Sequence, residues 1–459
     1  MCHASAMLRN LALLFAVALL GTARVCSAQF SAVESIDRDL QRNATTEQFS
    51  GAILIAKGGR VLLDKGYGRT IYPSGGVNTG ETRFRIGSLT KQFTAAAILQ
   101  LRDEGKLSLD DSVCSYVQPC PAGWSAITLF HLLSHTSGIP SYTAQPGYAN
   151  IRARPVTPAQ LLALIEPLPL GFVPGSAFEY GDSGYLVLGV IIEKVSGNSY
   201  AGFLKTRILE PLGMSATGCT NLSPSDVNAQ GYLPGSGGLS PASAVDASAA
   251  FSSAGMYSST RDLSRWARAL MSDRILSNLS RKEMFTPGLE DFGFGWIVPK
   301  SRPVTYLHLG ELAGFESAIF VLPQLGVVAV VLSNIEGMDI QPLAADGAIA
   351  GAYAEYEGDY ALSELKKTLR VFVKGGALKA QTGRGSPLVL DYVSGDSFVA
   401  LHGTESEVRI DFTRNDAGEV VGVRAEQFGK RFSGTRNAVA GPRVGGATAL
   451  SSSANNIHR

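Results

Sequence analysis

A serine and a lysine lie three residues apart in the segment RFRIGSLTKQFTAAAILQL, at Ser88 and Lys91. On a helix, that spacing places both side chains on one face within contact distance. Gly87 lets the chain turn tightly into such a helix, so the Ser88 hydroxyl would lie at its N-terminus, where the helix dipole favours developing negative charge. The apolar neighbours of Lys91 could lower its pKa by desolvation, and the lysine would then accept the serine proton. The pair therefore predicts nucleophilic attack by Ser88.

The Ser-x-x-Lys spacing is weak evidence by itself, because it recurs in the polar segment Ser363–Lys366. Taken alone, Ser88 could equally be an N-cap serine and Lys91 a solvated lysine. Ser183 competes as a nucleophile, since its surroundings, FEYGDSGY, look like the nucleophile loop of a trypsin-like protease. That loop needs a second glycine after Gly184, and the YLVLGVIIEKVSG that follows has a helical pattern. The Gly-x-Ser-x-Gly elbow of α/β-hydrolases does not occur in the chain.

Three short motifs together carry a resemblance to a known family. Ser88–Lys91, Tyr180-Gly181-Asp182 and His308-Leu309-Gly310 have the order and separations of the active-site motifs of serine β-lactamases and penicillin-binding proteins. The chain most resembles the β-lactamase-related branch that includes class C β-lactamases, D-aminopeptidases, DD-carboxypeptidases and esterases. Supporting stretches across roughly residues 34–336 are EGKLSLDDSV, HLLSHTSGIP, GYLVLGVIIEKVSG, ILEPLGMSATG, SSAGMYSSTRDLSRW and GFGW.

The resemblance implies a role for each motif residue. Ser88 forms an acyl-enzyme, Lys91 is the base, and Tyr180 passes the proton to the leaving group and helps to activate water. A tyrosine can exchange protons at neutral pH when a nearby lysine charge stabilises its phenolate. The backbone N–H groups of Ser88 and of Glu311, which follows Gly310, would form the oxyanion hole. Ser183 is then a loop or helix-start residue.

Two positions depart from the family pattern. Asp182 stands where the family usually has Asn, and an ionised carboxylate could pair with Lys91 and hold it protonated, which would shift the work of the base to Tyr180. His308 and Leu309 stand where β-lactamases usually have Lys followed by Thr or Ser, and this pattern is more similar to the esterase and peptidase members. We expect His308 to be a partly charged substrate contact or an additional general base.

The predicted function is hydrolysis of esters, D-amino-acid amides or peptides, or β-lactams through a Ser88 acyl-enzyme. The alternative is a penicillin-binding or sensor protein of the same fold that turns over slowly. The sequence predicts no cofactor. His131 and His135 have the spacing of a zinc pair on a helix, but no third ligand is evident, so no metal is predicted. The partner is a small-molecule or peptide substrate, because a net charge of +1 gives no reason to expect nucleic acid.

The elements that position these residues follow from the patterning. A chain of 459 residues is expected to form two domains. Strand-like alternation begins near Phe49, helical patterns follow, and strands return near Gly314, which predicts an α+β domain over residues 29–352 whose sheet joins both ends. The resemblance implies an antiparallel sheet flanked by helices. Short alternating strands then predict a separate all-β part, a barrel or a sandwich, over residues 353–436, and the resemblance implies a small lipocalin-like barrel there. A disordered tail is predicted over residues 437–459.

The N-terminus and the cysteines indicate export. An apolar run, Leu11–Gly21, follows Arg9 and ends in a small-residue site, so residues 1–28 are predicted to be a signal peptide cleaved after Ala28. The mature protein would be periplasmic or secreted, with no later membrane span. An oxidising compartment favours a Cys114–Cys120 disulfide, which leaves Cys219 as an odd thiol.

Overall fold

The computed structural model describes residues 31–437, except 224, 226–227, 403–405 and 428. The predicted signal peptide and the predicted tail, apart from Asn437, lie outside the described residues. Among the described residues, no helix is both long and apolar enough to cross a membrane.

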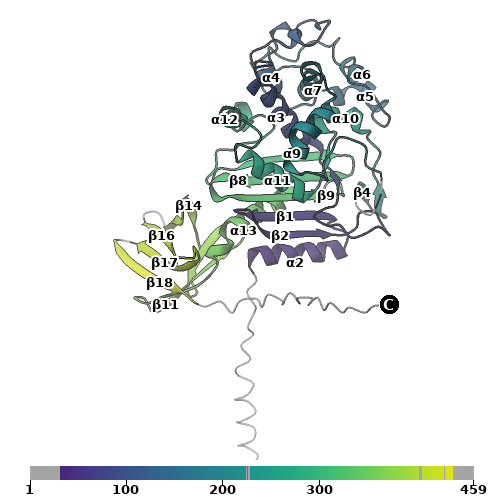
Figure 1. The fold of residues 1–459 in the computed structure, drawn as a ribbon. Helices are drawn as coiled ribbons and strands as arrows, with labels where there is room; N and C mark the ends of the chain where they lie inside the picture. Colours follow the sequence, from purple (N-terminus) through teal and green to yellow (C-terminus); the bar gives the residue numbers. More distant parts are fainter. Residues whose placement is uncertain (1–30, 224, 226–227, 403–405, 428, 438–459) are drawn as a thin grey trace, which may run out of the picture.

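A five-stranded antiparallel sheet (Figure 1) is the centre of the α+β part, and its strand order is β2-β1-β9-β8-β7. The sheet joins strands from both ends of this part, as predicted. The β1–β2 hairpin turns at Gly58 and Gly59, both with positive φ, and pairs Gly51 with Tyr67. The five strands are β1 (Gly51–Lys57), β2 (Arg60–Tyr67), β7 (Tyr306–Leu312), β8 (Phe315–Leu322) and β9 (Val327–Ser333).

Helices cover both faces of this sheet. On one face lie α2 (Ala32–Thr45), which begins with a capping box between Ser31 and Glu34, and α13 (Ile340–Tyr353). On the other face lie α11 (Thr260–Leu270) and a helical region built around α3 (Thr90–Asp103). The remaining helices of that region are α4 (Leu129–Leu133), α5 (Pro146–Ala149), α6 (Pro158–Leu162), α7 (Ser183–Ser196), α8 (Tyr200–Leu204), α9 (Glu210–Leu212), α10 (Ala247–Ala254) and α12 (Asn278–Met284). Two small ladders, β3 (Phe84–Arg85) with β6 (Tyr257–Ser258) and β4 (Tyr232–Gly235) with β5 (Gly238–Pro241), complete it.

The predicted all-β part is a nine-stranded antiparallel sheet with the order β13-β12-β11-β10-β18-β17-β16-β15-β14. Its two end strands are separated along the chain by Leu390 alone, so the sheet curls into a nearly closed barrel. The strands are β10 (Gly358–Leu362), β11 (Lys367–Val373), β12 (Leu378–Thr382), β13 (Leu388–Val389), β14 (Asp391–Ser394), β15 (Ser397–His402), β16 (Ser406–Arg414), β17 (Val420–Gln427) and β18 (Lys430–Arg436).

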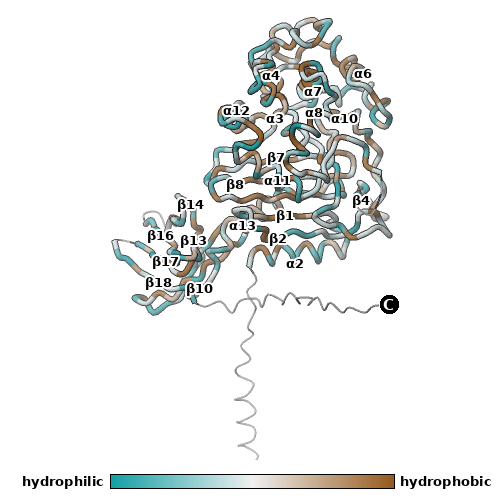
Figure 2. Tube along the Cα trace, in the orientation of Figure 1, coloured by the Kyte–Doolittle hydropathy of each residue, from teal (hydrophilic) through white to brown (hydrophobic). Residues whose placement is uncertain are grey.

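The hydrophobic core has two parts, one on each face of the five-stranded sheet. One fills the space between the sheet and the helical region. The other begins on the opposite face of the sheet, continues along α13 and enters the barrel, where Tyr356 packs against Phe398 and Phe412. Figure 2 shows hydrophobic stretches along the strands of the sheet and of the barrel. Lys57 at the end of β1 also pairs with Glu355, whose other oxygen accepts from Arg414 of the barrel. The barrel is therefore held against the five-stranded sheet by apolar packing and by ion pairs.

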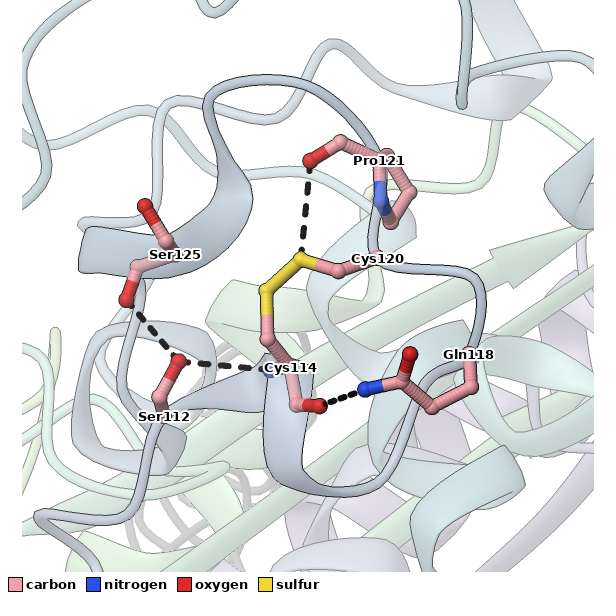
Figure 3. Close-up of a disulfide and its surroundings, with 6 residues drawn as sticks. All are labelled: Ser112, Cys114, Gln118, Cys120, Pro121 and Ser125. Carbon is pink, nitrogen blue, oxygen red and sulfur yellow. Dashed lines mark hydrogen bonds between the residues drawn. A yellow bond between two sulfur atoms is a disulfide. The ribbon is translucent and has the colours of Figure 1, made fainter.

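The predicted disulfide is present between Cys114 and Cys120, with 5.1 Å between the two Cα atoms (Figure 3). It closes a short loop over the helical region. Cys219 is the free cysteine of the described residues.

Candidate active site

Ser88 lies in a tight turn that leads into α3. The turn, Gly87–Leu89, is a 3-10 helix, and α3 begins two residues after Ser88, at Thr90. Lys91 lies in the first turn of α3, and its Nζ donates to Ser88 Oγ over 3.0 Å. The predicted contact is therefore present. The alternative of an N-cap serine is wrong, because the N-cap position belongs to Leu89.

Lys91 is fully buried and has three hydrogen-bond acceptors. Besides Ser88 Oγ, they are Asp182 Oδ1 at 2.7 Å and the Ser253 carbonyl at 3.2 Å. An ammonium has three protons to donate, so each proton has a partner. Burial acts to lower the pKa of Lys91, but the neighbouring Asp182 carboxylate outweighs it, and the pKa lies above its ordinary value. The expectation of a lowered lysine pKa is wrong, and the lysine is charged.

Asp182 is fixed on both sides, just before α7. Its Oδ2 accepts from Thr143 Oγ1 over 2.9 Å, and its backbone N–H donates to Ser141 Oγ. Burial acts to raise the pKa of Asp182, but the Lys91 charge and the hydrogen bonds from Lys91 and Thr143 to the carboxylate lower it. Asp182 therefore holds Lys91 protonated, as its departure from the family pattern predicted. Thr143 was not predicted, because no motif marks a threonine 39 positions before its partner.

Tyr180 lies between Lys91 and the solvent. The Lys91 Nζ is 4.9 Å from the centre of its ring, and 41% of the residue's surface is exposed. The rings of His135 and Phe292 lie 4.5 and 5.6 Å from it, and that of His308 lies at 6.3 Å. The structure thus brings the three predicted catalytic residues, Ser88, Lys91 and Tyr180, to one place.

His308 lies on β7 and is buried, with 2% of its surface exposed. Its Nδ1 is 2.5 Å from the Leu309 carbonyl, which can only accept, so Nδ1 carries the proton and Nε2 is bare. Among the described residues, Nε2 has no hydrogen-bond partner. Burial, with a contribution from the Lys91 charge, lowers the pKa of His308 to about 3. The expectation of a partly charged substrate contact is therefore wrong, and the alternative, an additional general base, stays a prediction.

His131 and His135 do not share a helix face. The helix α4 ends at Leu133, and His135 has a φ of 56°. His131 Nδ1 accepts from the Thr128 backbone, and His135 Nδ1 accepts from the Gly181 backbone. In the described part of the chain, no three His, Cys, Asp or Glu side chains are grouped to hold a metal ion.

The backbone N–H of Glu311 points away from the sheet toward Ser88. On the edge strand β7, Leu307 exchanges both backbone hydrogen bonds with Ile297, outside the sheet, and alternation gives Glu311 the same outward direction. At Gly87, with φ of 48°, an added Cβ would lie 2.7 Å from Glu311 N. At Gly310 it would lie 2.2 Å from the Ile86 carbonyl and 3.0 Å from Ser88 N. Two glycines thus allow β7 to approach the nucleophile's turn, which is the geometry of an oxyanion hole. No role follows for the exposed Glu311 side chain.

Ser183 has a structural role at the start of α7, as predicted. The residue is 1% exposed, and its hydroxyl accepts from the Tyr142 backbone over 2.8 Å and donates to the Pro140 carbonyl over 2.7 Å. The serine loop that suggested a trypsin-like protease is therefore a helix start.

An antiparallel sheet with a helical region on one face, and a Ser–Lys–Tyr site at its edge, is the architecture of the penicillin-recognising serine hydrolases. Residues 36–352 match the family model described as Beta-lactamase, and the chain belongs to this family.

Relatives and solved structures agree with this membership. Penicillin-binding protein 4* of Bacillus subtilis is 33% identical over 317 residues, which cover 63% of this chain and 69% of the relative. The octameric penicillin-binding protein homologue from Pyrococcus abyssi is 27% identical, with a TM-score of 0.60 over 87% of this chain and 99% of its own. A D-stereospecific amidohydrolase from Streptomyces sp. is 27% identical, with a TM-score of 0.56 over 65% and 94% of the two chains.

Proposed function

We propose that this protein is an exported serine hydrolase that cleaves esters and D-amino-acid amides or peptides through an acyl-enzyme on Ser88. The observation that carries the proposal is the contact of Ser88 Oγ with a buried, charged Lys91, beside Tyr180 and two glycines that admit an oxyanion hole. The similarity to a D-stereospecific amidohydrolase supports the amide substrates. The predicted signal peptide and the disulfide, a bond typical of oxidising compartments, support a periplasmic or secreted location.

The charged Lys91 sets the direction of proton transfer. Since Lys91 donates to Ser88 Oγ, the serine's own proton must go to another acceptor, and we assign that role to the phenol oxygen of Tyr180, whose ring lies beside the ammonium. The Ser88 Oγ–carbon bond forms while the carbonyl oxygen becomes an oxyanion held by the N–H groups of Ser88 and Glu311. The bond to the leaving oxygen or nitrogen then breaks, and Tyr180 returns the proton to that atom. Water attacks the acyl-enzyme by the reverse sequence.

Neutral esters should be better substrates than β-lactams. A β-lactam presents a carboxylate, which needs a cation or hydroxyl donors as it loses water. In the third motif Leu309 has no hydroxyl, and His308 is neutral with its proton given to a backbone carbonyl. The motif therefore supplies neither group.

One observation favours a second candidate, a slow-turnover penicillin-binding protein. Asp182 holds Lys91 protonated, so the lysine cannot help to activate the deacylating water. Such a protein would acylate at Ser88 and release its product slowly.

The test is labelling with a fluorescent fluorophosphonate and a fluorescent penicillin, followed over time, together with turnover of a p-nitrophenyl ester and a chromogenic cephalosporin. Ser88→Ala should abolish labelling and turnover, while Ser183→Ala should keep both. The ester should exceed the cephalosporin in kcat/KM at pH 7. Stable penicillin labelling without turnover would support the second candidate. A cephalosporin rate at or above the ester rate would refute the preference for esters. Arg152, which lines a cavity of about 340 Å³ beside Glu311, would then be the candidate cation for the β-lactam carboxylate.

A further inference from the structure

An aromatic wall stands beside Tyr180, formed by Phe178 and Phe292. The two phenyl rings lie 5.0 Å apart at an angle of 36°, and Phe292 lies 5.6 Å from Tyr180 and 5.5 Å from His135. Both phenylalanines are half-buried. The neighbouring imidazoles of His135 and His308 are buried, and burial lowers the pKa of each. The wall is therefore apolar, and the two imidazoles beside it carry no charge at neutral pH.

Phe292 is held in place by a strained turn. The two residues before it, Glu290 and Asp291, both have left-handed backbones, with φ of 52° and 58°. The Phe292 carbonyl accepts from Gly288 N over 2.7 Å, and its N–H donates to the Leu289 carbonyl over 3.1 Å. Non-glycine residues in this conformation persist where the surrounding structure fixes them, and such residues concentrate at functional sites. The turn thus gives the Phe292 ring a defined position beside Tyr180.

The position of the wall along β7 identifies the side of the substrate that it meets. Phe292 lies near His308, Ser88 lies near Gly310, and the cavity that contains Thr143 and Arg152 lies beyond Glu311. The wall and this cavity are therefore on opposite sides of the nucleophile. In the proposed reaction Tyr180 protonates the leaving atom, so that atom and its substituent lie on the Tyr180 side.

We propose that Phe178 and Phe292 form a leaving-group subsite that selects apolar and aromatic alcohols or amines. The inference rests on the proposed function, and it assigns the acyl group of the substrate to the cavity beyond Glu311. Stacking and edge contacts with the phenyl rings would stabilise an aryl substituent, while a charged substituent would lose its water without gaining a partner.

The test uses two butyrate esters, benzyl and ethyl, whose leaving alcohols are similar in acidity. We expect the native enzyme to favour the benzyl ester by about tenfold or more in kcat/KM, the effect of burying part of one ring. Phe292→Ala should reduce the benzyl-to-ethyl ratio by about fivefold or more, and Phe178→Ala should act in the same direction. Phe292→Tyr should retain the ratio, since it keeps the ring. Phe130→Ala is the matched control, because Phe130 is also exposed but packs against Phe294.

Two further measurements distinguish failure of the leaving-group subsite from failure of the proposed function. Fluorophosphonate labelling of Ser88 reports whether each variant is folded and has its nucleophile. An unchanged benzyl-to-ethyl ratio in labelled Phe292→Ala and Phe178→Ala would overturn the subsite. A change that follows acyl length at a fixed alcohol would also overturn it, because the wall would then bind the acyl group. Loss of both labelling and turnover in the native protein would instead defeat the proposed function.

Discussion

Replacement of Asp182 by Asn tests whether a buried charge pair holds Lys91 protonated. The Nζ–Oδ1 distance of 2.7 Å corresponds to an attraction of about 6 kcal/mol at an effective dielectric constant of about 20. Asn keeps the shape and can still accept from Thr143, but it leaves Lys91 buried without a counter-ion. Removing one partner of a buried pair lowers the free energy of unfolding by about 3–5 kcal/mol.

The loss of unfolding free energy in Asp182→Asn depends on pH, because Lys91 can release its proton. In the native protein, the raised Lys91 pKa stabilises the fold at pH below its ordinary value of 10.5, and this is lost as pH rises through the folded value. The lowered Asp182 pKa stabilises the fold above its ordinary value of 3.8, and this is lost as pH falls through the folded value. Between pH 5 and pH 9 the contribution of the native pair to the free energy of unfolding is thus constant. In Asp182→Asn, Lys91 can escape its burial cost by releasing a proton, which costs about 1.4 kcal/mol per pH unit below 10.5.

The cost of burying Lys91 in this variant therefore cannot exceed about 5 kcal/mol at pH 7 or about 2 kcal/mol at pH 9. Urea denaturation of both proteins at pH 6, 7, 8 and 9 measures the difference in the free energy of unfolding. We expect that difference to shrink by about 1–3 kcal/mol between pH 7 and pH 9, from about 3–5 kcal/mol to at most about 2 kcal/mol. Asp359→Asn, which breaks the exposed pair with Arg370, is the matched control and should cost at most about 1 kcal/mol. A difference that stays constant with pH, or is absent at pH 7, would refute the charged pair.

Three other predictions follow from the structure. Gly310→Ala should lower ester kcat/KM by about a hundredfold or more, since its Cβ would meet the Ile86 carbonyl at the oxyanion hole; Gly237→Ala, in open space, should leave it unchanged. Lowering the pH from 7 to 6 should not raise cephalosporin turnover relative to ester turnover, because His308, with a pKa of about 3, stays neutral; a rise would contradict its buried position. A chain ending at Ala352 should still label at Ser88 but melt at a lower temperature in calorimetry, because the core continues into the barrel at Tyr356; an unchanged melting temperature would show that the two parts are independent.

The sequence predicted the elements of the site whose partners lie within a motif. Three-residue spacing was enough to place Ser88 against Lys91, and Gly87 predicted the tight turn into the helix. Alternation of apolar residues was enough to predict the strands of the sheet and of the all-β part. These features are local, so a pattern in the chain carries them.

The charge of Lys91 could not be decided from the sequence alone, because it depends on partners that only the fold brings together. Its third acceptor is the carbonyl of Ser253, 162 positions away, and the hydroxyl that fixes its counter-ion comes from Thr143 on another segment. Whether a lysine near apolar residues is charged depends on such partners, because burial alone favours the neutral form. The same reasoning holds for His308. Its ring lies beside those of Tyr180 and Phe292, which come from other segments, so its own motif could not predict its burial.

The states of Lys91 and His308 limit how the site can recognise a substrate. The Lys91 charge is balanced by Asp182 and directed at Ser88, Asp182 and the Ser253 carbonyl, so none of its protons is left for a substrate. His308 adds no charge, and its only proton is given to the Leu309 carbonyl. In the proposed mechanism, stabilisation of the oxyanion therefore falls to two backbone N–H groups, which act on any carbonyl. Discrimination between substrates would then come from the side chains around Ser88, with Phe178 and Phe292 on one side and Arg152 in the cavity on the other.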